Sequence, residues 1–162
     1  MRRKDREITD TASILQIVSR TKYLHLGLLD EAYPYVVPMH YGFEFNEQDG
    51  SLVFYLHSAE EGHKLDLIAL NPNVCIELEC DAELISGGEN PCKYGSSFAS
   101  VIGRGQAEIL TDPLEKLKGL RLLMLNQTGR DFTIDEEMVS SVTVLKVCVS
   151  DYTAKSRPKM RS

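Results

Sequence analysis

The chain has 162 residues, enough for one domain of ordinary size, and 43% of them are hydrophobic, so it can bury a sizeable core. No long apolar run indicates a membrane span, and the basic start MRRKDRE leads into no apolar segment of a secretory signal. We therefore expect a single domain over residues 1–162 with basic ends, a cytoplasmic location and no membrane partner.

The net charge of -6 hides an uneven distribution. The first seven residues carry four basic side chains against two acidic ones, and Lys155–Ser162 carries four basic side chains and no acid. The body between them holds ten basic and twenty-two acidic residues. An acidic body repels nucleic acid, so no nucleic-acid partner is expected, and any local group of cations in it becomes informative.

The first half of the chain predicts one helix followed by strands. The helix is expected over Asp10–Ser19, capped by Asp10 or by the threonine before it. Strands are expected over Lys22–Asp30 and Tyr33–Phe45, and the turn NEQDG returns the chain as the strand Ser51–His57. In the strand that starts at Tyr33, the face that belongs in a core consists of Tyr35, Val37, Met39, Tyr41, Phe43 and Phe45.

The second half predicts further helices and strands. Pro72 ends a short helix over Gly62–Asn71. The remaining elements are a strand over Val74–Cys80, a loop rich in turn formers over residues 81–95, a strand over Ser97–Leu110, a helix over residues 111–127 and a final strand over Ser140–Tyr152. In the final strand the alternation slips between Val144 and Leu145, so we expect a bulge or two buried faces there.

These elements amount to about six strands, mostly joined by links of hairpin length, with three helices at the periphery and no repeated βαβ unit. The sequence therefore predicts a mainly β fold, a six-stranded antiparallel barrel with a few helices. Such a barrel can hold a ligand between strands or between subunits.

The four cysteines do not have the spacing of a metal site. Cys75 and Cys80 are five residues apart on one expected strand, so their side chains point to opposite faces. Cys92 and Cys148 are isolated, and no CxxC or HxxxH spacing occurs. We expect buried, reduced thiols, no disulfide and no metal ion.

The junction after the strand Ser51–His57 carries many hydrogen-bond donors. A helix N-terminus offers unpaired backbone N–H groups and the positive end of its dipole, and Ser58, His63 and Lys64 add side-chain donors around the same point. Gly62 lets a ligand approach the backbone closely. The pattern indicates a site for a phosphate-sized anion. A solvated turn with Lys64 in water is the alternative that spacing leaves open.

The neighbouring strand offers free backbone groups. Pro38 lacks an N–H, so this strand is expected at an edge or a bulge, where a flat heteroaromatic ring with an amide-like edge could bind. His40 lies on the face away from the core, near such a ring, although an ordinary surface or packed histidine fits as well. The small residues around Gly103 and Gly105 leave room for a ring or a partner chain, and tight barrel packing explains them equally well.

Six segments together resemble a known family. MRRKDREI, YPYVVPMHYGFE, FYLHSAEEGHKLDLI, NPNVCIELE, FASVIGRGQAEIL and VSDYTAKS occur in the order and spacing of the nitroimidazole-resistance (Nim) proteins. These proteins lie within the FMN-binding split-barrel superfamily that includes pyridoxamine 5'-phosphate oxidase. The resemblance covers nearly the whole chain, and its most specific part is the block His-Ser-Ala-x-x-Gly-His-Lys. It implies a split β-barrel homodimer with two FMN sites at the subunit interface.

The resemblance also implies cofactor-binding residues. Those along the flavin ring would be Pro38, Met39, His40 and Tyr41, those near the ring and ribityl chain His57 and Ser58, and those at the phosphate Gly62, His63 and Lys64. Ser100 stands where the oxidases have a polar flavin contact. Lys155 in TAKS resembles the Nim-type Gly-Lys near the interface, with Ala154 in place of that glycine.

Two functions follow from the resemblance. The first is an FMN-dependent reductase that takes electrons from a donor such as NADH or NADPH and passes them to a nitroaromatic or similar small acceptor, with His57 as the catalytic proton donor. The alternative is a non-catalytic flavin- or haem-binding module. Pyridoxamine phosphate oxidase activity is not expected, because the chain has no tryptophan, whereas the C-terminal substrate segment of that enzyme is rich in Arg and Trp.

Overall fold

Strands make up most of the structure, a computed structural model that describes residues 3–158. In chain order the elements are the 3-10 helix η1 (Lys4–Arg6), β1 (Glu7–Ile8), α1 (Thr11–Arg20), β2 (Tyr23–Asp30), β3 (Tyr33–Asn46), β4 (Ser51–Ser58), α2 (His63–Leu70), β5 (Asn73–Ile85), the 3-10 helix η2 (Pro91–Lys93), β6 (Gly95–Ile109), α3 (Pro113–Thr128), α4 (Glu136–Ser140) and β7 (Thr143–Arg157). The six expected strands are present, and β1 is an additional, seventh strand. Asp10 caps α1 as predicted, accepting a hydrogen bond from the Ser13 amide.

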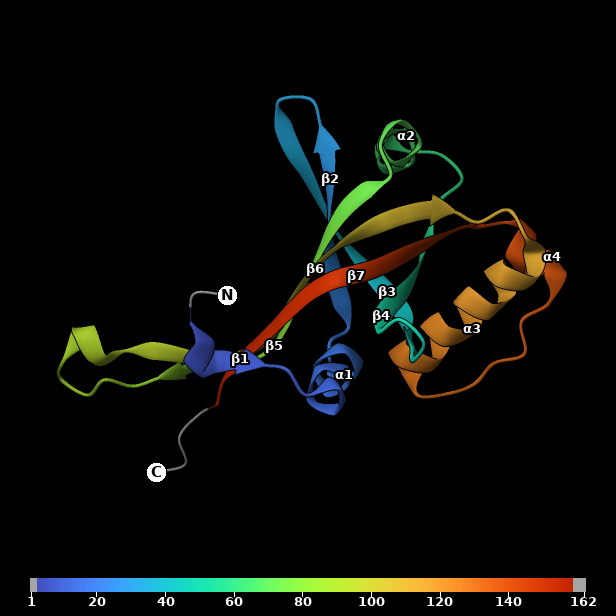
Figure 1. Cartoon of the computed structure of the whole chain (residues 1–162). Coiled ribbons are helices and arrows are strands. Elements are labelled where there is room, and N and C mark those ends of the chain that lie inside the picture. The colour runs from blue at the N-terminus through green and yellow to red at the C-terminus, as the bar shows by residue number, and fades with distance from the viewer. Residues whose placement is uncertain (1–2, 159–162) are drawn as a thin grey trace.

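The sheet closes into a barrel because β7 pairs on both sides. The strand order in the described chain is β1-β7-β4-β3-β2-β5-β6, and β7 also pairs with β6. Each of these pairings is antiparallel. The strands β2 to β7 therefore form the predicted antiparallel barrel, and β1 lies beside the far end of β7 (Figure 1).

The barrel is split where β3 changes partners. Residues 33–40 pair only with β2, and residues 41–46 pair only with β4. The first half of β3 is thus an edge, as Pro38 predicts. The ladder with β4 ends at the pair Tyr41–Leu56, one step before His40 and His57 would pair. An opening therefore lies between the first half of β3 and the end of β4.

The predicted core face of β3 is confirmed. Met39 and Tyr41 are buried, and the other members of that face pack against the same cluster inside the barrel. The helix α3 packs mainly on β3 and β4, while α1 contacts β5 and β6, and α2 contacts β2 and β6. The outward side chains in the middle of β5, β6 and β7, including Cys75, Arg104 and Cys148, are exposed. That face of the described barrel has no helix over it.

The expectation of a loop over residues 81–95 is wrong at both ends of that stretch, because β5 continues to Ile85 and β6 begins at Gly95. After an irregularity between Cys80 and Glu83, β5 and β6 resume pairing, with Leu84 opposite Ser96 and Ile85 opposite Gly95. The many turn-forming residues predict a loop, but the ladder depends on pairing between β5 and β6, which the local composition does not reveal. We call residues 81–94 the arm, and Figure 1 shows it projecting from the barrel on the side where β1 lies.

The small residues of β6 serve tight barrel packing. A Cβ at Gly105 would collide with the main chain of Cys148 on β7. The bulge of β7 lies at Ser150, because Arg104 and Gly105 are opposite Asp151 and Val149. Between Val144 and Leu145 the expectation of two buried faces is confirmed: Leu145 belongs to the barrel core, and Val144 to a second cluster with Val53, Tyr55 and Leu110.

Three of the four cysteines are exposed, which corrects the expectation of buried thiols. Cys75 and Cys148 lie on the outward face of their strands and Cys92 lies in the arm, while Cys80 packs against the core. Cys75 and Cys80 thus occupy opposite faces, as their spacing predicts. No helix among the described residues is long and apolar enough to cross a membrane.

Candidate functional site

The junction of β4 and α2 holds polar groups without partners. Ser58 is 6% exposed, and its Oγ is buried with no hydrogen-bond partner in the described chain. Gly62 precedes the first turn of α2 with φ of 144°, a backbone conformation that favours glycine, and no side chain caps this helix. An unsatisfied buried hydroxyl costs about 1–3 kcal/mol, so the arrangement fits a polar ligand at this point.

The two charged side chains of the first turn of α2 differ in their contacts. His63 Nε2 lies 2.7 Å from Asp30 Oδ2, and the His63 ring meets Tyr35 edge to face at 5.2 Å, so His63 ties α2 to the β2–β3 hairpin. Lys64 is half-buried and has no hydrogen bond or ion pair with the side chains and main chain that the structure describes. Its Nζ lies 4.0 Å from the position of a Cβ at Gly62. A free ammonium group therefore stands beside uncapped amides, the chemistry that binds a phosphate.

The opening of the barrel brings other predicted residues near this junction. Pro38 and His40 are exposed on the edge of β3, and Met39 points into the core. His40 Nδ1 lies 3.0 Å from Gln127 Oε1, which orients its ring toward α3. His57 is exposed at the end of β4, across the opening. The side chains on both sides of the split are thus accessible to a ligand that enters it.

Tyr41 has a structural role at the same place. Its side chain is fully buried, and its hydroxyl donates to the carbonyl oxygens of Val18 at 2.6 Å and Thr21 at 3.0 Å. Burial raises the pKa of this hydroxyl well above its ordinary value. The Tyr41 side chain therefore belongs to the core, and only its main chain adjoins the opening.

Ser100 and Lys155 lie together but far from the junction. They are register partners on β6 and β7, and Lys155 Nζ lies 5.3 Å from the centre of the Phe98 ring. Along β7, Lys155 follows Val144, the register partner of His57, by eleven residues. At the rise of a β-strand this separation is about 35 Å. One chain cannot bring both groups to one ligand.

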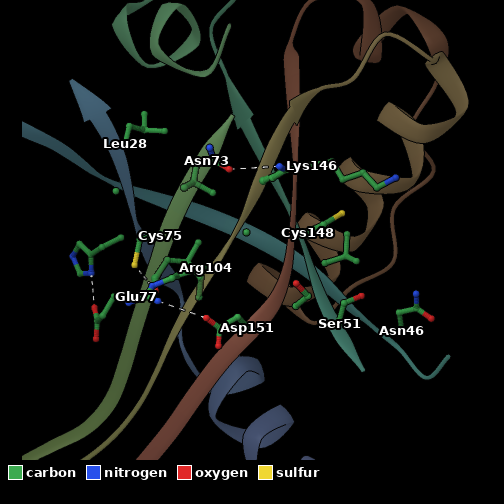
Figure 2. Close-up of a pocket in the computed structure, with 18 of the residues that line it drawn as sticks. Leu28, Asn46, Ser51, Asn73, Cys75, Glu77, Arg104, Lys146, Cys148 and Asp151 are labelled. Carbon is green, nitrogen blue, oxygen red and sulfur yellow. Dashed lines mark hydrogen bonds and ion pairs between the residues drawn. The ribbon is translucent and has the colours of Figure 1, made fainter. Parts of the chain in front are cut away.

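A broad open groove of about 1560 Å³ lies on the uncovered outer face of the barrel. Figure 2 shows Cys75, Arg104, Cys148 and Asp151 along it, from β5, β6 and β7. None of the predicted site residues lines this groove. The sequence pattern did not predict a groove here, although Gly105, one of the small residues expected to leave room for a ring or a partner chain, lines it. Among the side chains that the structure describes, no three His, Cys, Asp or Glu residues gather as a set of metal ligands.

Comparison with known proteins identifies the family of the chain. The family model for pyridoxamine 5'-phosphate oxidase matches residues 10–156. The chain is 33% identical to a candidate 5-nitroimidazole antibiotic resistance protein from Bacteroides thetaiotaomicron VPI-5482, with a TM-score of 0.77 over 93% of this chain and 86% of that one. No protein of curated function matches the sequence.

Two solved structures of lower identity share the fold. The flavocytochrome Anf3 from Azotobacter vinelandii is 19% identical, with a TM-score of 0.75 over 98% of this chain and 72% of that one. The FAD and haem binding protein from Mycobacterium smegmatis is 13% identical, with a TM-score of 0.76 over 97% of this chain and 76% of that one. The molecule is thus a split-barrel protein. It belongs to the pyridoxamine 5'-phosphate oxidase family, and its resemblance to nitroimidazole-resistance proteins is confirmed.

Replacing Ser58 by alanine should have opposite effects on stability and on binding. Ser58→Ala removes an unsatisfied buried hydroxyl, so the free energy of unfolding of the ligand-free protein should rise by about 1 kcal/mol. If the hydroxyl bonds to a flavin, flavin affinity should fall by roughly tenfold. Chemical denaturation and flavin titration measure the two quantities.

Ser97→Ala is the matched control. Ser97 is as buried as Ser58, but its Oγ donates to the Asp81 carbonyl at 2.9 Å, so this substitution should lower stability by about 1 kcal/mol. A loss of stability in Ser58→Ala would contradict the assignment of its hydroxyl to a ligand.

Proposed function

We propose that the protein is an FMN-dependent reductase of nitroaromatic or similar small acceptors. The observation that carries the proposal is the unpartnered Ser58 hydroxyl beside the uncapped start of α2 and the free Lys64 ammonium. These are the groups that a phosphorylated ligand needs, and they lie at the opening of the split barrel. The similarity to a candidate nitroimidazole-resistance protein supports the choice of acceptor.

Residues at different positions around the opening would have different roles. FMN, when bound, supplies a two-electron carrier between NADH or NADPH and the acceptor. Lys64 and the first amides of α2 hold the phosphate, and Ser58 orients the ligand between that anchor and the opening. His57 is exposed across the opening from the β3 edge, where its imidazole can deliver a proton to the acceptor.

A second copy of the chain would complete the site. In a twofold dimer, a contact between two different patches occurs twice, once in each direction. Ser100 and Lys155 of each copy can therefore meet the β4–α2 junction of the other copy. The midpoint between these two groups falls at Gly105 on β6 and at its register partner Val149 on β7. That midpoint lies at the groove, on the face that no helix of the described chain covers. We therefore place the dimer axis there.

A charge placed near this axis should separate the subunits. Ile102 is 42% exposed on the outer face of β6, three residues from the midpoint at Gly105. Ile102→Asp should yield a monomer by light scattering and lose flavin affinity at the same time, because the site would lack its second half. Leu114→Asp on α3, an exposed apolar position outside the groove, is the control and should remain a dimer. A dimeric Ile102→Asp variant would place the axis elsewhere.

Rapid-mixing spectroscopy tests the reductase function. The purified protein should show a flavin spectrum that bleaches with NADH or NADPH and returns when a nitroimidazole is added. A flavin that binds but is never reduced by either nucleotide would favour a binding module. A Soret band would point to haem in place of flavin.

The phosphate contact has its own test in Lys64→Ala. Removing this ammonium should cost on the order of 1.5 to 3 kcal/mol of FMN binding, a roughly ten- to hundredfold loss of affinity. Riboflavin lacks the phosphate, so it should bind the variant and the unmodified protein almost alike. Fluorescence titration of both ligands measures the difference, and equal FMN affinities for the two proteins would exclude Lys64 from the phosphate site.

A further inference from the structure

The arm presents large apolar side chains away from the barrel. Leu84 is 70% exposed and Tyr94 is 46% exposed. Figure 1 shows the arm extending well beyond the rest of the sheet. Apolar side chains on a projecting element indicate an interaction surface, because leaving them in water is unfavourable.

The arm is also folded in advance of any contact. Strand pairing continues to Ile85 and Gly95, and Asn90 Oδ1 accepts a hydrogen bond of 3.0 Å from the Cys92 amide at the start of η2. Gly87 packs so closely that a Cβ there would meet the main chain of Asn90 and Tyr94. A preformed arm gives up little conformational entropy when it docks.

The proposed dimer determines where the arm ends. Tyr94 precedes Ser100 by six residues on the path into β6, which is about 20 Å at the rise of a strand. Ser100 of one copy lies at the β4–α2 junction of the other, so the arm continues past that junction. The elements beside the junction are α2 and the β2–β3 hairpin. They carry their own exposed apolar side chains, Leu70 at 84% and Tyr33 at 81%.

We propose that the arm of each copy packs on α2 and the β2–β3 hairpin of the other copy, with Leu84 and Tyr94 against Tyr33 and Leu70. The inference rests on the proposed function, since it uses the two-copy flavin site. It adds an interaction surface outside the groove. It also gives α2 a second support, because the helix that carries Lys64 lies between its own barrel and the arm of the other copy.

Energy transfer from an introduced tryptophan tests this contact. The chain has no tryptophan, so Tyr94→Trp introduces a unique indole whose emission a nearby flavin quenches. We would pair a chain carrying Tyr94→Trp and Lys64→Ala with an unmodified chain. FMN then fills the junction of the unmodified chain, and the indole on the other chain should lose most of its emission.

The reverse pairing is the matched control. A Tyr94→Trp chain with intact Lys64, paired with a Lys64→Ala chain, holds FMN at its own junction, about 50 Å from its arm along the strands. Its indole should keep most of its emission. Equal emission in the two pairings would overturn the proposal, and Leu84→Trp repeats the comparison from the other strand of the arm. FMN absorption of the unmodified chain, and its bleaching by NADH or NADPH, show separately whether the proposed function holds.

Discussion

The change of partners within β3 is the constraint on which the rest of the structure depends. One continuous strand, β3, pairs with β2 through residues 33–40 and with β4 through residues 41–46. Two neighbours can share a strand in this way only where they diverge, and the divergence leaves main-chain groups unpaired. The edge at Pro38 and the end of β4 at Ser58 are the two sides of that divergence. The candidate site therefore exists because β3 and β4 do not pair there.

Tyr41 fixes the position of this change. It is the first residue of β3 that pairs with β4, and its hydroxyl binds carbonyl oxygens of Val18 and Thr21 at the end of α1. Its own carbonyl accepts hydrogen bonds from Asn126 and Gln127 of α3. Helix ends otherwise leave such carbonyls without partners. The docking of two helices and the location of the opening thus depend on one buried side chain and its peptide.

Local patterns in the sequence predicted much of this structure. Alternation identified the buried face around Met39, the Asp10 cap identified the start of α1, and the spacing around Gly62 identified an uncapped helix start with Lys64 beside it. Each of these features depends on residues close in sequence, so a single sequence carries the signal.

The missed features depend on distant residues. His63 contacts Asp30, thirty-three positions away in the sequence, and no local pattern predicts that contact. The arm forms because Leu84 meets Ser96 across a turn-rich stretch. The separation of Ser100 from the β4–α2 junction follows from strand register, a property of the whole sheet. Motif spacing therefore predicts candidate site residues but could not show that they lie in two groups.

The bulge of β7 determines which residues near the C-terminal end face outward. Side chains alternate along a strand, so the extra residue at Ser150 shifts the phase of everything after it by one position. Before the bulge, Leu145, Val147 and Val149 point into the core, and after it Ala154 does. Without the extra residue, Lys155 would point into the barrel and Ala154 would point out. A one-residue insertion thus decides whether a lysine is buried inside the protein or available on its surface.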